Sequence, residues 1–382
     1  MPPTTNLLAA RARTLAAHPL VRALAVVLLL FVFLVGVNGL GDGFKSLGRG
    51  LLESFFSATE NPFMGLMVGI LATTLVQSSS VTTSLIVGLV AAPENPLPVA
   101  NAVAMVMGAN IGTTVTNTIV ALAHMGRREE FRRAFSVATC HDFFNYIAVV
   151  TLLPLEMATG YLRWTATELS SFLTGFGGME YDSPLKGLLK AALVPIKGLV
   201  GLVVSSEKTA AVVLIVLSGL LIYTALMLLV RVMRRTMHSR VETIVSRGLH
   251  RSVIYAILVG VLVTVLVQSS SITTSLLVPL AGAGLLTLQQ AFPITIGANI
   301  GTTVTAFMAA LAATGVNAQA GITIALVHLL FNLSGTLLIL PVKRIRNVPL
   351  RAAQWLADTA VESRGLALAY VIILFYALPA LF

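Results

Sequence analysis

The sequence predicts an all-α polytopic membrane protein, and three observations support this fold class. Hydrophobic residues make up 57% of the 382 residues and charged residues only 10%, against about 25% charged residues in an average soluble domain. The apolar residues form long continuous runs, whereas an outer-membrane barrel shows alternation over segments of roughly ten residues. The motifs of one half of the chain also recur, in the same order, in the other half. This composition excludes soluble globular, disordered and fibrous proteins.

The excess of positive charge does not indicate nucleic-acid binding. The formal net charge is +10, but Lys and Arg lie in short segments between the apolar runs, where such residues set the orientation of a membrane protein. The chain contains a single cysteine, Cys140, so it forms no intrachain disulfide bond.

The first half is expected to consist of a cytoplasmic basic arm at 1–20 and a first repeat at 21–160. An apolar span at 23–37 is followed by a turn rich in Gly and Asp at 38–44. Three further apolar runs follow, and two of them are interrupted midway, which predicts broken membrane helices. The runs are 62–90, interrupted at 77–80, then 96–123, interrupted at 108–112, and finally 134–155, which follows a basic loop at 124–133.

The second half repeats this order after an outer linker at 161–208. Lys186, Lys190 and Lys197 lie on one helical face of the linker, which predicts an amphipathic segment at the outer membrane interface. The second repeat occupies 209–345 and the C-terminal segment with the last membrane helix occupies 346–382. The expected parts are a span at 209–230, a basic loop at 231–251, interrupted runs at 253–280 and 286–313, and spans at 322–342 and 365–382.

Sequence identity between the halves is too extensive for chance. The segment 76–84 (VQSSSVTTS) matches 267–275 at eight of nine positions, and 108–116 (GANIGTTVT) matches 297–305 at all nine. His141 and Asn145 have counterparts in His328 and Asn332, within the shared pattern His-x-x-Phe-Asn. The chain therefore consists of two homologous halves.

The distribution of Lys and Arg predicts that the two repeats have inverted topology. We expect each QSSS segment to form a re-entrant hairpin and the N-terminus to be cytoplasmic. The segments 1–22, 124–133, 231–251 and 342–351 then face the cytoplasm and carry 17 of the 25 Lys and Arg residues, as the positive-inside rule requires. The segments 41–50, 156–208 and 314–320 face the outside and carry 7 of them. Inverted repeats with interrupted helices are the architecture of many secondary transporters.

Each QSSS segment places hydroxyl and carboxamide groups inside an apolar run. Such groups can bond back to their own helix or pack helices together, which is the structural alternative. Two copies at helix breaks instead favour a binding role, because the N–H groups at the start of a half-helix attract an anion and unwound carbonyls coordinate a cation. In the GANIGTTVT pair, we expect the glycines to bring helices close together and Asn110, Asn299 and some threonines to line the site.

Asp142 is the only acid well inside an apolar run. A buried carboxylate is costly in a membrane and is a functional candidate by default. With no Lys or Arg in its run, we expect a cation from solution as its partner, and a protonated structural Asp is the alternative. His141 and His328 are expected to be structural hydrogen-bond donors.

Enzyme motifs are absent from the sequence: there is no Walker A loop, HExxH, GxSxG or CxxC. Transport driven by an ion gradient is therefore expected. A divalent anion entering a core without Lys or Arg needs co-bound cations to offset its charge.

These motifs resemble the type II sodium–phosphate cotransporters. The resemblance runs from about residue 62 to 341 and includes both QSSS segments, GANIGTTVTN at 108–117 and HDFFN at 141–145. It implies sodium-coupled uptake of inorganic phosphate with two re-entrant hairpins that meet at the membrane midplane, and an Asp at position 142 implies electrogenic transport. Animal members carry Gln and Asp where this chain has His124 and Arg127, so the sodium site linked to those residues is not carried over.

On this basis, each candidate residue is assigned to one of two ligands. The phosphate candidates are Gln77, Ser78, Ser79, Ser80, Asn110, Thr113, Gln268, Ser269, Ser270, Ser271, Asn299 and Thr302. The sodium candidates are Asp142, Asn145, Thr114, Thr303, Asn332, Ser84 and Ser275.

We expect no cofactor besides transported Na⁺, and the expected partners are phosphate, sodium, the lipid bilayer and a second copy of the chain. The expected location is a bacterial inner membrane. A symporter of another oxyanion or a carboxylate remains the alternative function. A membrane enzyme with a QSSS serine as nucleophile, or a scaffold, is the alternative of another class, and an enzyme would need a base positioned near that serine.

Overall fold

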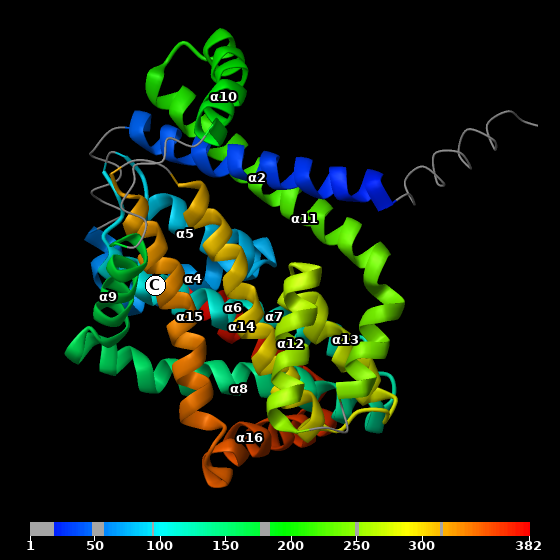
Figure 1. The fold of residues 1–382 in the computed structure, drawn as a ribbon. Helices are drawn as coiled ribbons and strands as arrows, with labels where there is room; N and C mark the ends of the chain where they lie inside the picture. The colour runs from blue at the N-terminus through cyan, green and yellow to red at the C-terminus, as the bar shows by residue number, and fades with distance from the viewer. Residues whose placement is uncertain (1–18, 48–56, 94, 176–183, 249–251, 314–315) are drawn as a thin grey trace, which may run out of the picture.

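The computed structural model describes residues 19–47, 57–93, 95–175, 184–248, 252–313 and 316–382. Residues 1–18, which include most of the predicted basic arm, lie outside the described part of the chain. Every regular element found in the described residues is helical, as the sequence predicts (Figure 1). Six of these helices are long and apolar enough to cross a membrane, so the prediction of a polytopic all-α protein is confirmed.

The helices of the first half are α2 (Pro19–Leu47), α4 (Pro62–Val76), α5 (Ser79–Val90), α6 (Val99–Thr113), α7 (Val115–Leu122), α8 (Arg128–Thr159) and α9 (Tyr161–Gly175). The second half contains α10 (Pro184–Val203), α11 (Glu207–Gly248), α12 (Val253–Val267), α13 (Ser270–Gly282), α14 (Leu288–Ala312), α15 (Ala318–Ile339), α16 (Lys343–Glu362) and α17 (Arg364–Ile372). A π-helical turn, η1 (Ile373–Ala377), leads into α18 (Leu378–Leu381).

The predicted breaks at the two QSSS segments are present, at matching positions. α4 ends before Gln77 and α5 begins at Ser79, while α12 ends before Gln268 and α13 begins at Ser270. The predicted breaks at 108–112 and 297–301 are wrong. α6 continues through 108–112 to Thr113, and α14 continues through 297–301 without a break.

The glycines of the GANIG segments are helix-contact positions rather than breaks, which explains the error. A Cβ on Gly108 would lie 2.0 Å from the carbonyl oxygen of Leu66 in α4, and a Cβ on Gly297 would lie 2.0 Å from that of Ile257 in α12. Only glycine permits so close an approach between backbones. The prediction that these glycines bring helices together is therefore confirmed in both halves.

A second set of glycines was also misread from the sequence. The predicted turn at 38–44 is helical, because α2 continues to Leu47, and most of the predicted basic loop at 231–251 belongs to α11. α2 and α11 lie side by side (Figure 1). A Cβ on Gly36 would lie 2.8 Å from Ile222 Cγ1 and one on Gly43 would lie 2.7 Å from Ile215 Cγ1. These glycines therefore serve a helix pair and not a turn.

The amphipathic segment predicted in the linker corresponds to α10. Leu189 and Leu193 are buried against Val35 of α2, whereas Lys190 and Lys197 are exposed. Lys197 forms an ion pair with Asp42, so the polar face of α10 also contacts α2.

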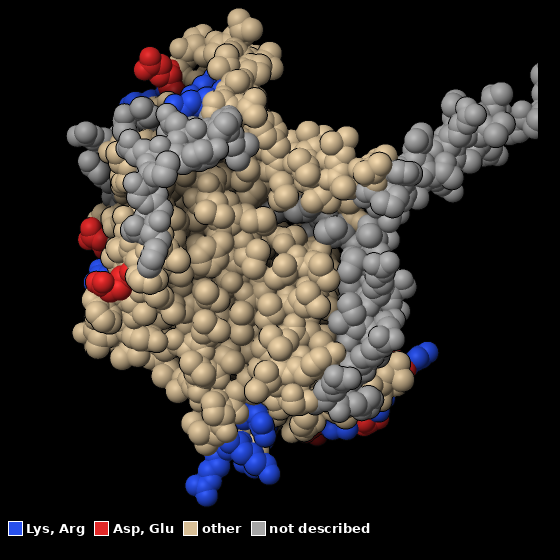
Figure 2. All heavy atoms as spheres, in the orientation of Figure 1, with Lys and Arg blue, Asp and Glu red and all other residues tan. Residues whose placement is uncertain are grey.

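Segments distant in sequence gather at two separate ends of the molecule. At one end, Asn317 Nδ2 donates a hydrogen bond to the carbonyl oxygen of Ala92 (2.6 Å), and Gln319 Nε2 donates to Ser171 Oγ (3.0 Å). At the other end, Arg133 Nη2 donates to the carbonyl oxygen of Gly282 (2.9 Å), and Arg132 contacts Asp358 (3.5 Å). Figure 2 shows Lys and Arg along the lower edge, a smaller group of charges at the upper left, and a broad uncharged area between them.

Candidate functional site

The two helix breaks share one backbone geometry. Gln77 and Gln268 adopt left-handed backbone conformations, with φ of 56° and 57°. Ser78 and Ser269 then act as N-caps, and their hydroxyl oxygens accept hydrogen bonds from the backbone N–H of Val81 and Ile272. A left-handed residue followed by a serine cap ends one helix and starts the next within two residues. The duplicated sequence therefore encodes a duplicated break.

The glutamine side chains hold each break to a neighbouring helix. Gln268 Nε2 donates to the carbonyl oxygen of Val265 (2.7 Å), and its Oε1 accepts a hydrogen bond from Thr305 (3.2 Å). Gln77 bonds in the same way to the Thr74 carbonyl and to Thr116. The carboxamides are thus already engaged, and their first role in this conformation is to fix the break.

The serines that begin α5 and α13 are differently placed. Their side chains are buried, with exposed fractions of 4% for Ser79 and 3% for Ser270. Among the described residues no hydrogen bond was found for the hydroxyl groups of Ser79, Ser80, Ser270 or Ser271. Each of these helix N-termini therefore combines backbone N–H groups with hydroxyls that no described side chain uses.

Each broken helix packs on the opposite half of the chain. α5 contacts α14 and α15, whereas α13 contacts α7 and α8. α5 therefore lies against the two helices that carry the GANIGTTVT and His-x-x-Phe-Asn motifs of the second half. α13 lies against α8, which carries the His-x-x-Phe-Asn motif of the first half, and against α7, which begins with the last two residues of the first GANIGTTVT segment. The candidate site is composed from both repeats.

A chain of buried side chains links the two halves. Asn145 Nδ2 donates to the carbonyl oxygen of Asn110 (2.8 Å), and Asn299 Nδ2 donates to Asn145 Oδ1 (2.9 Å). His141 Nε2 lies 2.7 Å from Asn299 Oδ1, and Asn117 Nδ2 lies 3.4 Å from His141 Nδ1. Asn117 Oδ1 accepts from the Thr274 and Ser275 hydroxyls of α13 (2.8 and 3.0 Å).

The order of donors and acceptors in this hydrogen-bond network follows from the carbonyl acceptor at its end. The Asn110 carbonyl only accepts, so Asn145 must present its NH₂ group there and its oxygen to Asn299. Asn299 then presents its oxygen to His141, which carries its proton on Nε2 and accepts on Nδ1. All these groups are buried, and a fully satisfied buried network favours one arrangement of the helices.

The equivalent residues of the second repeat form only part of the matching set. Asn332 Nδ2 donates to the carbonyl oxygen of Asn299 (3.4 Å), as Asn145 does to that of Asn110, but no bond from His328 or Asn332 to the Asn110 side chain was found in the described structure. Asn110 Nδ2 donates to the Val106 carbonyl of its own helix (3.0 Å). The two ring nitrogens of His328 and the Oδ1 atom of Asn332 have no hydrogen-bond partner among the described residues, although both side chains are buried. Hence His141 is a structural hydrogen-bonding residue, as expected, whereas His328 is not one in this conformation. The His-x-x-Phe-Asn motif of the first half therefore binds the Asn side chain of the other half, whereas the identical motif of the second half does not.

Asp142 is fully buried on α8, with an exposed fraction of 0%. Its Oδ2 accepts hydrogen bonds from Tyr370 (2.7 Å) and Thr118 (3.4 Å), and Thr114 is a further neighbour of the carboxyl. Its Oδ1 has no partner among the described residues. The buried described residues include no Lys or Arg, so no protein cation balances this carboxyl group.

The remaining candidate threonines and serines lie at several places rather than in one cluster. Most of their hydroxyls donate to carbonyls of their own helices, which leaves oxygen lone pairs available for a cation. These residues are Thr113, Thr114, Thr302, Thr303 and Ser84. Asn332 Nδ2 donates to the carbonyls of Asn299 (3.4 Å) and His328 (3.2 Å). The structure thus brings Asp142 near Thr114, and Asn145 near Asn299, whereas the bond found for the Ser84 hydroxyl is to the Ser80 carbonyl of its own helix.

His124 and Arg127 lie at the charged end of the molecule and face the same acid. Arg127 Nη1 donates to Glu130 Oε1 (2.7 Å), and His124 Nδ1 lies 3.9 Å from Glu130 Oε2. Exposed pairs of this kind contribute little to stability.

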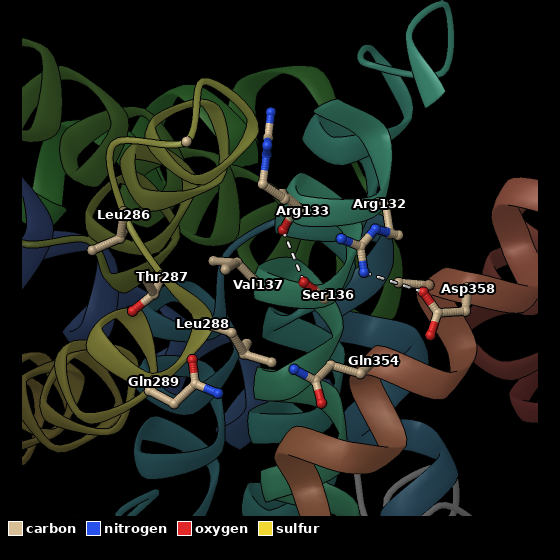
Figure 3. Close-up of a pocket in the computed structure, with 12 residues that line it drawn as sticks. Arg132, Arg133, Ser136, Val137, Leu286, Thr287, Leu288, Gln289, Gln354 and Asp358 are labelled. Carbon is tan, nitrogen blue, oxygen red and sulfur yellow. Dashed lines mark hydrogen bonds and ion pairs between the residues drawn. The ribbon is translucent and has the colours of Figure 1, made fainter. Parts of the chain in front are cut away.

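A pocket of about 270 Å³ lies at the same end, between α8, α16 and the segment that joins α13 to α14 (Figure 3). Its lining includes Arg132, Ser136, Thr287, Gln354 and Asp358, and Figure 3 shows the contact between Arg132 and Asp358 at one side of it. None of the duplicated motif residues lines this pocket, so it is separate from the candidate site.

Three residues of these networks that lie outside the duplicated motifs were missed by the sequence analysis as site candidates. Asn117 follows the duplicated segment directly, but Ala306 stands at the corresponding position, so duplication does not reveal it. Thr118 is next to it, and Tyr370 belongs to the C-terminal helix outside both repeats. A polar residue inside an apolar run was the only available signal for all three.

Comparison with known proteins identifies a family for most of the chain. The family model described as Na+/Pi-cotransporter matches residues 32–181 and 220–353. The chain is similar to sodium-dependent phosphate transport protein 2B of Homo sapiens, with 33% identity over 441 residues that cover 92% of this chain and 63% of the human protein. It is also similar to sodium-dependent phosphate transport protein 2A of Rattus norvegicus, with 34% identity over 92% of this chain and 66% of the rat protein.

The chain thus spans slightly less than two thirds of the length of these curated relatives. No solved structure matches it.

Proposed function

This chain belongs to the Na+/Pi-cotransporter family, and from that premise we propose that it is a secondary active symporter that couples inward sodium movement to the uptake of inorganic phosphate. The observation that carries the proposal is an interior with two hydroxyl-lined helix N-termini and, among the described residues, no buried Lys or Arg. Such an interior suits the transport of an anion together with cations better than it suits catalysis.

Charge balance explains why sodium and phosphate move together. Backbone N–H groups and hydroxyls stabilise an anion but do not neutralise a divalent one in a low-dielectric site. With no buried Lys or Arg in the described residues, the positive charge has to come from co-bound sodium. Binding of either solute then favours binding of the other, which is the basis of coupling.

The phosphate site proposed here lies at the N-termini of α5 and α13. Ser79, Ser80, Ser270 and Ser271 offer hydroxyls that no described residue uses, next to the first backbone N–H groups of each helix. Gln77 and Gln268 hold the breaks open for the ligand, while Asn110, Asn299, Thr113 and Thr302 belong to the glycine-containing helices beside them. The close glycine contacts support this role because they keep the neighbouring helices rigid.

Asp142 is the proposed ligand of one sodium ion, and its charge makes transport electrogenic. Its Oδ1 is buried without a protein partner, and a buried carboxylate of this kind is costly without a cation. Thr114 supplies a nearby hydroxyl oxygen, and hydroxyl and carboxylate oxygens are ligands that hard cations prefer.

The two ends of the molecule support inverted repeats with re-entrant hairpins. The chain enters the first hairpin near Pro62 and leaves it near Ala92, which is hydrogen-bonded to Asn317 of the predicted outer side. It leaves the second hairpin at Gly282, which is hydrogen-bonded to Arg133 of the predicted cytoplasmic side. Equivalent ends of the two hairpins therefore lie at opposite ends of the molecule. We place the protein in a bacterial inner membrane with a cytoplasmic N-terminus, because most Lys and Arg residues then face the cytoplasm.

Unequal pairing of identical motifs supports alternating access. In this conformation His141 and Asn145 bind Asn299, whereas His328 and Asn332 do not bind the Asn110 side chain. Both repeats contain the same His and Asn residues. A second conformation, in which His328 and Asn332 bind the Asn110 side chain instead, would therefore form the same kinds of hydrogen bond. Two such conformations facing opposite sides of the membrane are what a symporter needs.

The variant His328→Leu tests this exchange. It removes two buried nitrogens that have no partner here, so the conformation described should become more stable while transport slows, because the exchanged pairing loses its histidine. His141→Leu is the matched variant and should destabilise this conformation. Thermal unfolding and uptake are measured on both. Normal uptake by His328→Leu would contradict the exchange.

A symporter of another oxyanion or a carboxylate is the alternative, because helix N-termini and hydroxyls also bind other anions. Competition with labelled phosphate uptake separates the two. Purified protein in liposomes, with an inward sodium gradient, takes up radioactive phosphate in the presence of unlabelled phosphate, arsenate, sulfate or a carboxylate. We expect unlabelled phosphate to compete at a lower concentration than sulfate or the carboxylate. Stronger competition by sulfate or the carboxylate would favour the alternative.

A further inference from the structure

Tyr370 forms the shorter of the two hydrogen bonds found between described side chains and the buried carboxyl of Asp142. Its hydroxyl lies 2.7 Å from Asp142 Oδ2, whereas the Thr118 hydroxyl lies 3.4 Å from the same oxygen. A distance of 2.7 Å is usual for an O–H···O hydrogen bond, and a bond of this kind to an ionised carboxylate is roughly twice as strong as one between neutral groups. Tyr370 therefore fixes one oxygen of the carboxyl and leaves Oδ1 without a partner.

The position of Tyr370 is itself determined by packing. Its ring makes edge contacts with Phe135 of α8 and with Phe375, at centroid distances of 6.4 and 6.1 Å. Phe375 is fully buried and lies in η1, a π-helical turn three residues after Tyr370. Single π turns within α-helices are frequent at functional sites, because they change the direction of the side chains around them.

Neither member of this pair belongs to the duplicated machinery. Leu329 occupies the position of Asp142 in the second repeat, so the carboxyl exists only once. Tyr370 lies beyond residue 353, where the family match ends. The contact between α8 and the C-terminal helix is therefore an addition to the two-repeat architecture. It is made at Asp142, the only buried acid among the described residues.

We propose that Tyr370 is a positioning residue for sodium binding at Asp142. Its hydroxyl holds Oδ2 and thereby orients the carboxylate so that Oδ1 faces the ion. The negatively charged group is then already in position when sodium binds. The inference rests on the proposed sodium role of Asp142 and adds a residue outside the repeats. The C-terminal helix then contributes directly to cation binding and is more than a membrane anchor.

The variant Tyr370→Phe tests the proposal, because it removes one oxygen atom and keeps the ring that packs on Phe135 and Phe375. Tyr376→Phe is the matched control: it lies in the same C-terminal helix, and no hydrogen bond to Asp142 was found for it in the described structure. The readout is equilibrium binding of radioactive sodium to the purified protein without phosphate. The sodium site at Asp142 is identified as the part of the sodium binding that is lost in the variant Asp142→Gly. Phosphate uptake by the parent protein is measured separately.

We expect Tyr370→Phe to weaken that sodium site about tenfold, since the hydrogen bond lost is to a charged group. Tyr376→Phe should bind sodium like the parent, and Tyr370→Phe should have no effect on sodium binding in an Asp142→Gly background. The phosphate concentration for half-maximal uptake at saturating sodium should be unchanged, which a general structural defect would not give. Thr118→Val removes the longer bond and should weaken the same site by less.

Unchanged sodium binding by folded Tyr370→Phe would overturn the proposal. If that variant is not recovered folded, unchanged sodium binding by Thr118→Val would overturn it. Loss of sodium binding that persists in the Asp142→Gly background would also overturn it, because Tyr370 would then act elsewhere. If Asp142→Gly removes no sodium, the inference fails together with the role of Asp142, and phosphate uptake by the parent still decides the proposed function on its own.

Discussion

Buried polar side chains in this protein divide into those whose hydrogen bonds are complete and those whose bonds are not. Asn145, Asn299 and His141 satisfy one another across the two halves. Asp142 and His328 retain atoms without partners among the described residues. Leaving a buried donor or acceptor unpaired costs about 1–3 kcal/mol, so such atoms are expected where a ligand or a second conformation supplies the partner.

For Asp142, replacement by Gly should leave sodium-dependent phosphate uptake but abolish the inward current that accompanies it. Removing the carboxylate removes one bound sodium ion and not the phosphate, because the proposed phosphate ligands lie on α5 and α13. Phosphate-induced current and radiolabelled uptake are recorded in one preparation. Glu60→Gly, which removes an exposed carboxylate, is the control. The same charge per phosphate in Asp142→Gly and in the parent would show that the sodium role is wrong.

At the helix breaks, Ser79→Phe and Ser270→Phe should each abolish uptake while the protein still folds. In our account the phosphate and not the protein core fills the space beside these hydroxyls, so a bulky side chain competes with the ligand. Uptake and the yield of folded protein are compared with those of Ser46→Phe, an exposed position on α2. Near-normal uptake by both variants would mean that the QSSS segments only pack helices.

At the scale of elements, close glycine contacts define the two repeats. In both halves the helix before the break packs on the GANIG helix so tightly that a single Cβ would collide with a carbonyl oxygen. Each pair thus forms a rigid unit against which the broken helix is positioned. Small residues at such contacts are the usual means of helix association in membranes.

The variant Gly108→Ala should destabilise the protein by about 1–3 kcal/mol, because the new Cβ would lie 2.0 Å from the Leu66 carbonyl oxygen. Gly219→Ala is the matched control: it also lies within a helix, but no atom lies within 4 Å of the added Cβ. The control should be neutral or stabilising by up to about 1 kcal/mol, because Ala favours helix more than Gly does. Thermal unfolding in detergent measures both. Equal unfolding temperatures for the two variants would contradict the contact.

The sequence was informative about these elements where a motif has a single structural meaning. Gln-Ser-Ser-Ser inside an apolar run predicted both helix breaks correctly, since the left-handed Gln and the capping Ser are local features. Glycine has two meanings, turn and close contact, and only the partner helix distinguishes them. That is why breaks were wrongly predicted at Gly108–Gly112 and at Gly297–Gly301, and a turn at 38–44.

The candidate site was predictable from two signals, which are the duplication of motifs and, for Asp142, an acid inside an apolar run. Asn110 and Asn299, Asn145 and Asn332 were found because each pair repeats. The unequal pairing of these residues was not predictable, since identical motifs carry no information about which copy is bonded. Tyr370 comes from a helix more than two hundred residues away from Asp142 in the chain, and long-range contacts of that kind follow from the fold alone.

At the scale of the whole molecule, Arg133, from a segment assigned to the cytoplasm, and Asn317, from a segment assigned to the outside, lie at separate ends. Contacts between Arg133 and Gly282 mark one end, and contacts between Asn317 and Ala92 mark the other. This separation agrees with the 17 Lys and Arg residues assigned to the cytoplasmic side. Our proposal that the two halves have inverted orientation depends on this separation.

Single cysteines introduced at Ala320 and Ser239 test the orientation in intact cells. A membrane-impermeant thiol reagent should label the cysteine at position 320 and not the one at position 239, because only the former lies on the outer side in our account. The native Cys140 is buried, so the parent protein is the unlabelled control. Reversed labelling would contradict the inverted-repeat arrangement.

The central claim is that sodium drives phosphate uptake, and replacement of the cation tests it most directly. Purified protein is reconstituted into liposomes, and uptake of radioactive phosphate is measured with an inward gradient of sodium, potassium or choline. Because the buried interior provides no Lys or Arg in the described residues, we predict uptake with sodium and uptake no higher than in protein-free liposomes with potassium or choline. Equal uptake with all three cations would contradict the claim.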